Sequence, residues 1–263
     1  METSLLENVP TALLCIGIVA LTTGVSIAGV LLVRRRVALS TLETHQDVAG
    51  YILAVVGVVY AVLLAFVVIS VWEQFEDAKG DANTEAATVG LLYRDALILD
   101  RGEGRAHVAV RDYARSVAGP EWDEMASEHR EHRATDAALD RVWATFRDMR
   151  PEGEADTVIY DKAVDRLHEA TELRRTRVLN SGNQLPGPLW GVLIAGAVIS
   201  IGFTYFFGVR SRAAQVLMVA AFSSSVGLVL FLILVLDLPF TGDVGVGPTS
   251  MERVIGEFPH YGD

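Results

Sequence analysis

Residues 48–72, VAGYILAVVGVVYAVLLAFVVISVW, form an apolar run that no charged residue interrupts. A helix needs about 20 residues to cross a bilayer core of about 30 Å, and this run is longer than that. A charge near the centre of such a run costs about 2.5–3.5 kcal/mol on insertion scales, so the absence of charge is informative. The run therefore predicts a membrane-spanning helix.

Three further runs, 11–33, 188–209 and 213–236, are also free of charge. Although 51% of the 263 residues are hydrophobic, the chain has a formal net charge of −11, so its charged and apolar residues are segregated. Buried helices of this length in a soluble protein would normally keep a polar stripe. The sequence therefore predicts an all-α membrane protein with four transmembrane helices, arranged as two hairpins in segments 1–72 and 188–236.

The segment between the hairpins, residues 73–187, is polar and acidic, with 24 acidic residues against 16 basic ones. An apolar stripe at heptad spacing runs through its first part, and only Glu85 breaks it. The stripe consists of Phe75, Ala78, Ala82, Val89, Leu92, Ala96 and Leu99. Because no proline lies between the second span and Leu99, we expect this transmembrane helix to continue beyond the lipid as one long helix.

Three more helical patterns follow in the same segment. The first is expected to end at Gly119-Pro120, the second just before Pro151, and the third at the break NSGNQLPGP, residues 180–188. Segment 73–187 is therefore predicted to be a helical-bundle extramembrane domain, inserted between transmembrane helices 2 and 3.

Arginines mark both short loops between the apolar runs. They occupy positions 34–36 after the first run, and positions 210 and 212 between the third and fourth. Short basic loops favour the cytoplasmic side, so we expect domain 73–187 and both termini to lie outside. Another arginine group at 174–177 weighs against this orientation, but a segment of more than about 60 residues translocates largely regardless of its charge.

The polar segment offers few residues for chemistry. His129 and His132 in EHREHR (128–133) have a spacing that can hold zinc, although a solvated helical face with ion pairs is the commoner outcome. The sequence has no glycine-rich phosphate loop, HExxH motif or nucleophile elbow. An acidic domain also disfavours nucleic acid. We therefore predict no enzyme activity, no cofactor, no metal site and no nucleic-acid partner.

Three acidic residues, Glu73, Glu76 and Asp77, follow the second span at once. Residues three and four apart on a helix are neighbours, so these carboxylates share roughly one face at the membrane mouth. In a symmetric oligomer each would form a ring that concentrates cations and repels anions. The alternative is a solvated helix face just outside the lipid, and the sequence leaves both open.

The fourth run ends in LDLPFTGDVGVGP (236–248), followed by TSME (249–252). We expect the side chain of Asp237 to bond backbone N–H groups of the following turn, Pro239 to stop the helix, Phe240 to sit back at the interface, and Gly242 to permit a reversal. TSME has the spacing of a capping box, with Thr249 as the cap. The tail, 237–263, would then return as a short helix onto the membrane surface or a neighbouring subunit. The apolar face of that helix consists of Met251, Val254, Ile255 and Phe258.

Three stretches together resemble the bestrophin-like domain family of bacterial membrane proteins: LPGPLWGVLIAGAVISIGFTYFFG (185–208), the tail LDLPFTGDVGVGP, and EAATVGLLYRDA (85–96). The tail is the most specific, although this chain has Val246-Gly247-Pro248 where the family often reads Val/Ile-Ser-Pro. The resemblance singles out Asp237, Pro239, Phe240, Gly242 and Pro248. It implies kinship to bestrophins, oligomeric anion channels of four-helix subunits whose large domain is cytoplasmic, opposite to the orientation that the arginines favour.

These observations lead to one functional prediction and one alternative. We predict a homo-oligomeric ion channel of the bacterial inner membrane that conducts inorganic ions and favours cations. The alternative is a non-conducting sensor or scaffold whose extramembrane helical domain binds a protein partner.

Overall fold

The computed structural model describes residues 10–101, 104–128 and 132–259, with the side chains of 43–46, 127 and 128 outside the description. Every regular element in these residues is helical, which confirms the all-α prediction. The elements are α2 (Thr11–Arg36), α3 (Leu39–Leu99), α4 (Ala106–Ser116), the π-helical turn η1 (Val117–Glu121), α5 (Trp122–Glu128), α6 (Arg133–Asp148), α7 (Glu154–Ser181), α8 (Gly187–Thr204), α9 (Arg212–Leu236) and α10 (Thr249–Gly256).

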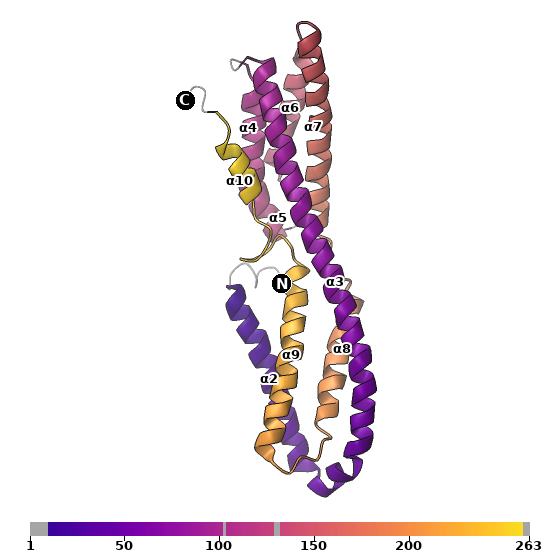
Figure 1. Ribbon diagram of the computed structural model, residues 1–263. Helices are drawn as coiled ribbons and strands as arrows, with labels where there is room; N and C mark the ends of the chain where they lie inside the picture. The colour runs from indigo at the N-terminus through magenta and orange to yellow at the C-terminus, as the bar shows by residue number, and fades with distance from the viewer. Residues whose placement is uncertain (1–9, 102–103, 129–131, 260–263) are drawn as a thin grey trace.

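The molecule is elongated and has two parts (Figure 1). We call α2, residues 39–72 of α3, α8 and α9 the apolar half, and residues 73–99 of α3 with α4–α7 and α10 the polar bundle. Among the described residues, four helices are long and apolar enough to cross a membrane, and they are those of the apolar half. The prediction of four membrane-spanning helices is therefore confirmed.

The third span is shorter than predicted, because α8 ends at Thr204 and not at 209. After Thr204 the backbone tightens: the N–H groups of Tyr205 and Phe206 bond carbonyls only three residues back. Tyr205 then lies so close to Gly29 of α2 that a Cβ on this glycine would be 2.6 Å from the tyrosine hydroxyl. The turn between α8 and α9 is thus packed directly on α2.

Helix α3 runs through both parts without a break, as the lack of proline predicted. Its 61 residues correspond to about 90 Å at 1.5 Å per residue. The predicted domain boundary at 72/73 therefore falls inside one continuous helix.

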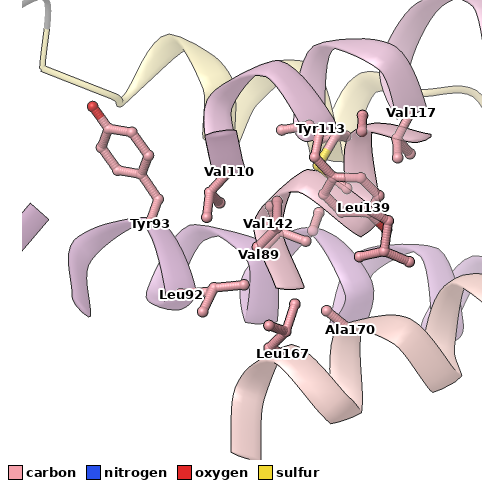
Figure 2. Packing of buried hydrophobic residues seen from close by; sticks show 14 of the residues in the cluster. Val89, Leu92, Tyr93, Val110, Tyr113, Val117, Leu139, Val142, Leu167 and Ala170 are labelled. Atoms are coloured by element: carbon pink, nitrogen blue, oxygen red, sulfur yellow. The ribbon is translucent and has the colours of Figure 1, made fainter. Parts of the chain in front are cut away.

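The stripe on α3 is the centre of the polar-bundle core (Figure 2). Val89, Leu92 and Ala96 are completely buried, and α7 packs along α3 over this length. Side chains of α4, η1 and α6 close the core from the other side; they include Val110, Tyr113, Val117, Leu139 and Val142. Phe75 belongs instead to a second cluster at the top of the apolar half.

The predicted helix end at Gly119-Pro120 is wrong. The chain continues from α4 through the π-helical turn η1, which contains Pro120, directly into α5. Proline has no N–H to donate and its ring clashes with the carbonyl four residues back, and the wider π-turn accommodates both. Helix α6 does end before Pro151, and α7 does run to the break at 182, as predicted.

The tail helix α10 lies along α3 and α4 of its own polar bundle, not on the membrane surface or a neighbouring subunit, which corrects the prediction (Figure 1). Met251 and Phe258 are buried there, and Phe258 stacks on Tyr93 with ring centroids 3.8 Å apart. A Cβ on Gly90 would be 2.9 Å from Val254, so α10 approaches α3 closely. The predicted capping box is absent, because Pro248 takes the cap position and Thr249 is already helical.

Candidate functional site

Asp237 lies where the two parts of the molecule meet, at the end of α9, and it is almost completely buried. Its Oδ1 accepts a hydrogen bond of 2.7 Å from the backbone N–H of Leu185, and its Oδ2 one of 3.3 Å from Nε1 of Trp190. These two bonds run to the segment that enters α8 and to its first turns, whereas bonds to the turn after Asp237 were predicted. The carboxylate therefore joins the end of the fourth span to the beginning of the third.

The residues after Asp237 connect α9 to the polar bundle. Phe240 is buried edge-to-face on Trp122, with centroids 5.9 Å apart, so its predicted place at the membrane interface is wrong. Thr241 donates to the carbonyl of Ala126 at 3.2 Å. Gly242 has φ +79°, the reversal that was predicted for it. The N–H of Val246 then bonds the carbonyl of Pro239 at 2.6 Å, which closes the loop. A short span of tail thus fixes the membrane helices to α5.

Glu73, Glu76 and Asp77 are all exposed on α3 directly above the apolar half. Glu76 makes one weak surface pair, with Lys79 at 3.5 Å. Asp77 lines a cavity of about 140 Å³ together with Asn180, Asn183 and Pro239. One turn further, burial and the charge of Asp77 raise the pKa of Asp81. The three acids are thus exposed on α3, and Asp77 meets the tail at Pro239.

A buried group of charged side chains, which the sequence analysis did not find, lies deeper in the polar bundle. We call Glu85, Glu121, Arg174 and Arg177 the ionic cluster. Its residues come from three elements, α3, η1 and α7. Glu85, Glu121 and Arg177 are at most 1% exposed.

Each arginine of the ionic cluster holds a carboxylate with two nitrogens. Arg177 bonds Glu85 at 2.6 and 3.2 Å and Glu121 at 2.7 Å. Arg174 bonds Glu121 at 2.9 and 2.5 Å and reaches the half-exposed Asp136 of α6 at 2.7 Å. Charge-assisted bonds of this kind are roughly twice as strong as neutral ones. The cluster therefore locks four helical elements together.

Apolar side chains surround the ionic cluster, and this burial shifts the pKa values of ionisable groups within and beside it. The guanidinium of Arg177 lies 4.8 Å from the ring of Trp122, and Met125 Sδ is 3.1 Å from its Nη1. Burial raises the pKa of Glu85, and Arg177 lowers it only in part. Burial also raises the pKa of Tyr113, whose hydroxyl has no hydrogen-bond partner in the described part of the chain. The ionic cluster is thus a group of charged side chains buried in an apolar core.

The described histidines of the polar bundle make separate local contacts. Within the described residues, no group of three or more His, Cys, Asp and Glu side chains could hold a metal ion. His132 bonds Thr135 at 3.1 Å, whereas His129 lies outside the described residues. The side chains of His107 and Asp100 bond each other at 2.7 Å, at the beginning of α4.

The comparisons with known proteins agree with this architecture. The sequence matches the family described as "Bestrophin-like domain" over residues 20–251, from the first span to α10. The chain belongs to the bestrophin-like domain family. A crystal structure described as that of "a membrane protein" is similar with a TM-score of 0.65 and 13% identity, and the match covers 90% of this chain and 95% of that one. A comparison with curated proteins finds no match.

Family membership and fold together make this bestrophin-like chain a multi-pass membrane protein. The matched region contains the acidic face, the ionic cluster and the tail motif. Two signals could have pointed to the ionic cluster in advance. Glu85 interrupts an otherwise apolar stripe, and Arg174 and Arg177 are three residues apart on α7, on its buried side.

Proposed function

We propose that this bestrophin-like chain is the subunit of a homo-oligomeric ion channel that favours cations. The observation that supports the proposal best is the exposed face of Glu73, Glu76 and Asp77, at the point where a continuous helix leaves the apolar half. Rings of acidic side chains at a pore mouth concentrate cations through their summed field. A rigid helix would hold such rings at a fixed height above the membrane.

The ion path is expected between subunits and not through one. Apolar side chains fill the interior of the apolar half, where Val71, Leu193 and Ile233 are completely buried. Tyr60 belongs to a neighbouring apolar cluster, and its hydroxyl donates to the carbonyl of Leu193 at 3.0 Å. An oligomer would therefore be needed to enclose a polar path.

Neutralising the acidic face tests this proposal. Purified protein in sealed liposomes should conduct ions. The triple variant Glu73→Gln, Glu76→Gln, Asp77→Asn should shift the reversal potential towards the equilibrium potential of the anion. The shift should be largest at low salt, because the Debye length rises from about 10 Å at 0.1 M to about 30 Å at 0.01 M.

A matched control neutralises Asp148, Glu152 and Asp161, which are exposed on the polar bundle. This variant should keep the parent's reversal potential. If the mouth variant also keeps it at low ionic strength, the acids do not line the path. If neither protein conducts, the channel proposal is wrong.

One observation favours the alternative, a non-conducting sensor or scaffold. A shallow cavity of about 640 Å³ lies between α4 and α6, with Arg105, Asp112 and Arg141 in its walls. Arginine is enriched at surfaces that bind a protein partner relative to the rest of a protein surface. Absence of flux, together with binding of a partner that Arg141→Glu weakens, would support this alternative.

We further propose that the protein lies in a bacterial inner membrane with the polar bundle and both termini outside. The support is that both arginine-bearing loops lie at one end of the apolar half, where Arg34 donates to the carbonyl of Val209 (Figure 1). Short basic loops favour the cytoplasm.

Thiol labelling of intact cells tests the orientation. In a Cys15→Ser background, Asp148→Cys should react with an impermeant maleimide, and Ser211→Cys should react only after the membrane is opened. The reverse pattern would place the polar bundle in the cytoplasm, as in bestrophins.

A further inference from the structure

The loop end of the apolar half concentrates positive charge. Helix α2 ends on Arg34, Arg35 and Arg36, and Arg210 and Arg212 flank the turn into α9. All of these except Arg34 are exposed, and Asp47 is an exposed acid near the beginning of α3. Such a surface attracts anionic lipid headgroups, and each arginine near the membrane surface adds to the attraction.

Arg34 differs from its neighbours because part of its guanidinium is buried. Its Nη2 donates to the carbonyl of Val209, which holds the group against the turn between α8 and α9. Its Nη1 is also buried, but no hydrogen-bond acceptor for it lies among the described residues. A buried cationic N–H without an acceptor is unfavourable, so this position calls for an anion.

A second buried polar atom without a partner lies beside the same turn, in the first turn of α9. Gln215 is 1% exposed and donates from Nε2 to the carbonyl of Phe207 at 2.9 Å. Its Oε1 finds no donor in the part of the chain that the structure describes. The turn therefore presents an unused donor on Arg34 and an unused acceptor on Gln215.

An apolar cavity of about 440 Å³ adjoins this turn. Its walls include Phe207, Val209, Met218 and Phe222, and they are almost entirely apolar. Val209 thus faces the cavity while its carbonyl accepts from Arg34. An occupant that fits both places needs an anionic group for the arginine and a hydrocarbon chain for the cavity.

We propose that this turn is a binding site for an anionic glycerophospholipid, with the phosphate on Arg34 and one acyl chain in the cavity. Guanidinium groups bind phosphate oxygens in a bidentate way, and Arg35, Arg36 and Arg212 add long-range attraction. A headgroup hydroxyl, as in phosphatidylglycerol, can donate to Oε1 of Gln215. The site does not depend on conduction, and it stands or falls separately from the channel proposal.

Titration of the purified full-length protein in a neutral detergent tests the site. Short-chain phosphatidylglycerol should raise the melting temperature in a saturable way, whereas phosphatidylcholine of equal chain length should have little effect. Inorganic phosphate at the same concentration should also have little effect, since it cannot fill the cavity. Arg34→Gln should weaken the apparent affinity for phosphatidylglycerol by roughly fivefold or more.

Two further variants complete the test. Arg115→Gln removes an exposed arginine from α4 and should leave the affinity unchanged. Met218→Trp narrows the cavity and should weaken phosphatidylglycerol binding even if Arg34→Gln does not fold. Equal stabilisation by the two lipids, or unchanged affinity in both Arg34→Gln and Met218→Trp, would overturn the proposal. Stabilisation by inorganic phosphate alone would overturn it too, by showing an anion site without lipid.

Discussion

Arg177→Met should lower the free energy of unfolding by about 3–5 kcal/mol, the range measured when one partner of a buried ion pair is removed. Arg177 is completely buried and is bonded to both Glu85 and Glu121. Methionine has a similar length and needs no hydrogen bonds, so the loss would come from the carboxylates that remain. Arg174 can still neutralise Glu121, but Glu85 would be left buried without its cation. Equilibrium unfolding in mixed micelles measures the change.

Glu85→Gln is the matched control from the other side of the same pair. The amide keeps an oxygen that can accept from Arg177, and Arg177 keeps Glu121 as its counter-ion. Because burial already raises the pKa of Glu85, the ionised form of this side chain is held at a disadvantage. We therefore expect a loss well below that of Arg177→Met. Equal losses in the two variants would show that the ionic cluster contributes through packing and not through charge.

The raised pKa of Glu85 also predicts how the stability of the protein depends on pH. Glu85 faces Arg177 and Arg174 from α7, Glu121 from η1 and Tyr113 from α4, and the sum of burial and these charges raises its pKa. Between the ordinary glutamate pKa and the raised value, the folded state binds the proton more tightly than the unfolded state. The contribution of Glu85 to stability is therefore complete below the ordinary value and is lost as pH rises through the raised one. The stability of the parent relative to Glu85→Gln should fall over that window.

Local features of the sequence were sufficient for much of the fold. Charge-free runs predicted the spans, the absence of proline before Leu99 predicted the continuous α3, and Pro151 marked the end of α6. Each of these depends on residues close together in the chain. The end predicted at Gly119-Pro120 failed because a π-turn is a local rearrangement that proline does not forbid.

The contacts of the candidate sites were much harder to predict, because they join distant segments. Arg177 is 92 residues from Glu85 and 56 from Glu121, so no spacing rule connects them. The apolar face of α10 indicated that this helix is covered on one side. The residues of that face do not indicate which surface covers them. The acidic face at Glu73 was predictable because it needs only one helix. Whether it lines a pore depends on the arrangement of subunits, which remains a proposal.

The contacts of Asp237 were hard to predict for the same reason, because they join segments that are distant in the sequence. The C-terminal end of a helix carries partial negative charge, so an aspartate at the end of α9 is unfavourable by itself. The structure places its carboxylate beside the N-terminal end of α8, which carries partial positive charge, although the backbone N–H that it accepts from belongs to Leu185, before the helix. The two helix ends are separated by the whole α8–α9 hairpin in sequence, and only the antiparallel packing of the helices brings these ends together. The acid thus bonds the segment that enters another helix, through the N–H of Leu185 and the indole of Trp190.

Asp237→Leu should therefore destabilise the protein, by about 2 kcal/mol or more, since it leaves two partly buried N–H groups without acceptors, each of which would cost about 1–3 kcal/mol if fully buried. Asp237→Asn should lose less, because its Oδ1 can still accept from Leu185 while its amide nitrogen faces the indole N–H of Trp190. Asp243→Leu replaces an exposed acid of the same tail and should change little. Trp190→Phe should lessen the effect of Asp237→Asn, because it removes the donor that asparagine cannot satisfy. If Asp237→Leu melts with the parent, the carboxylate does not hold α8 to α9.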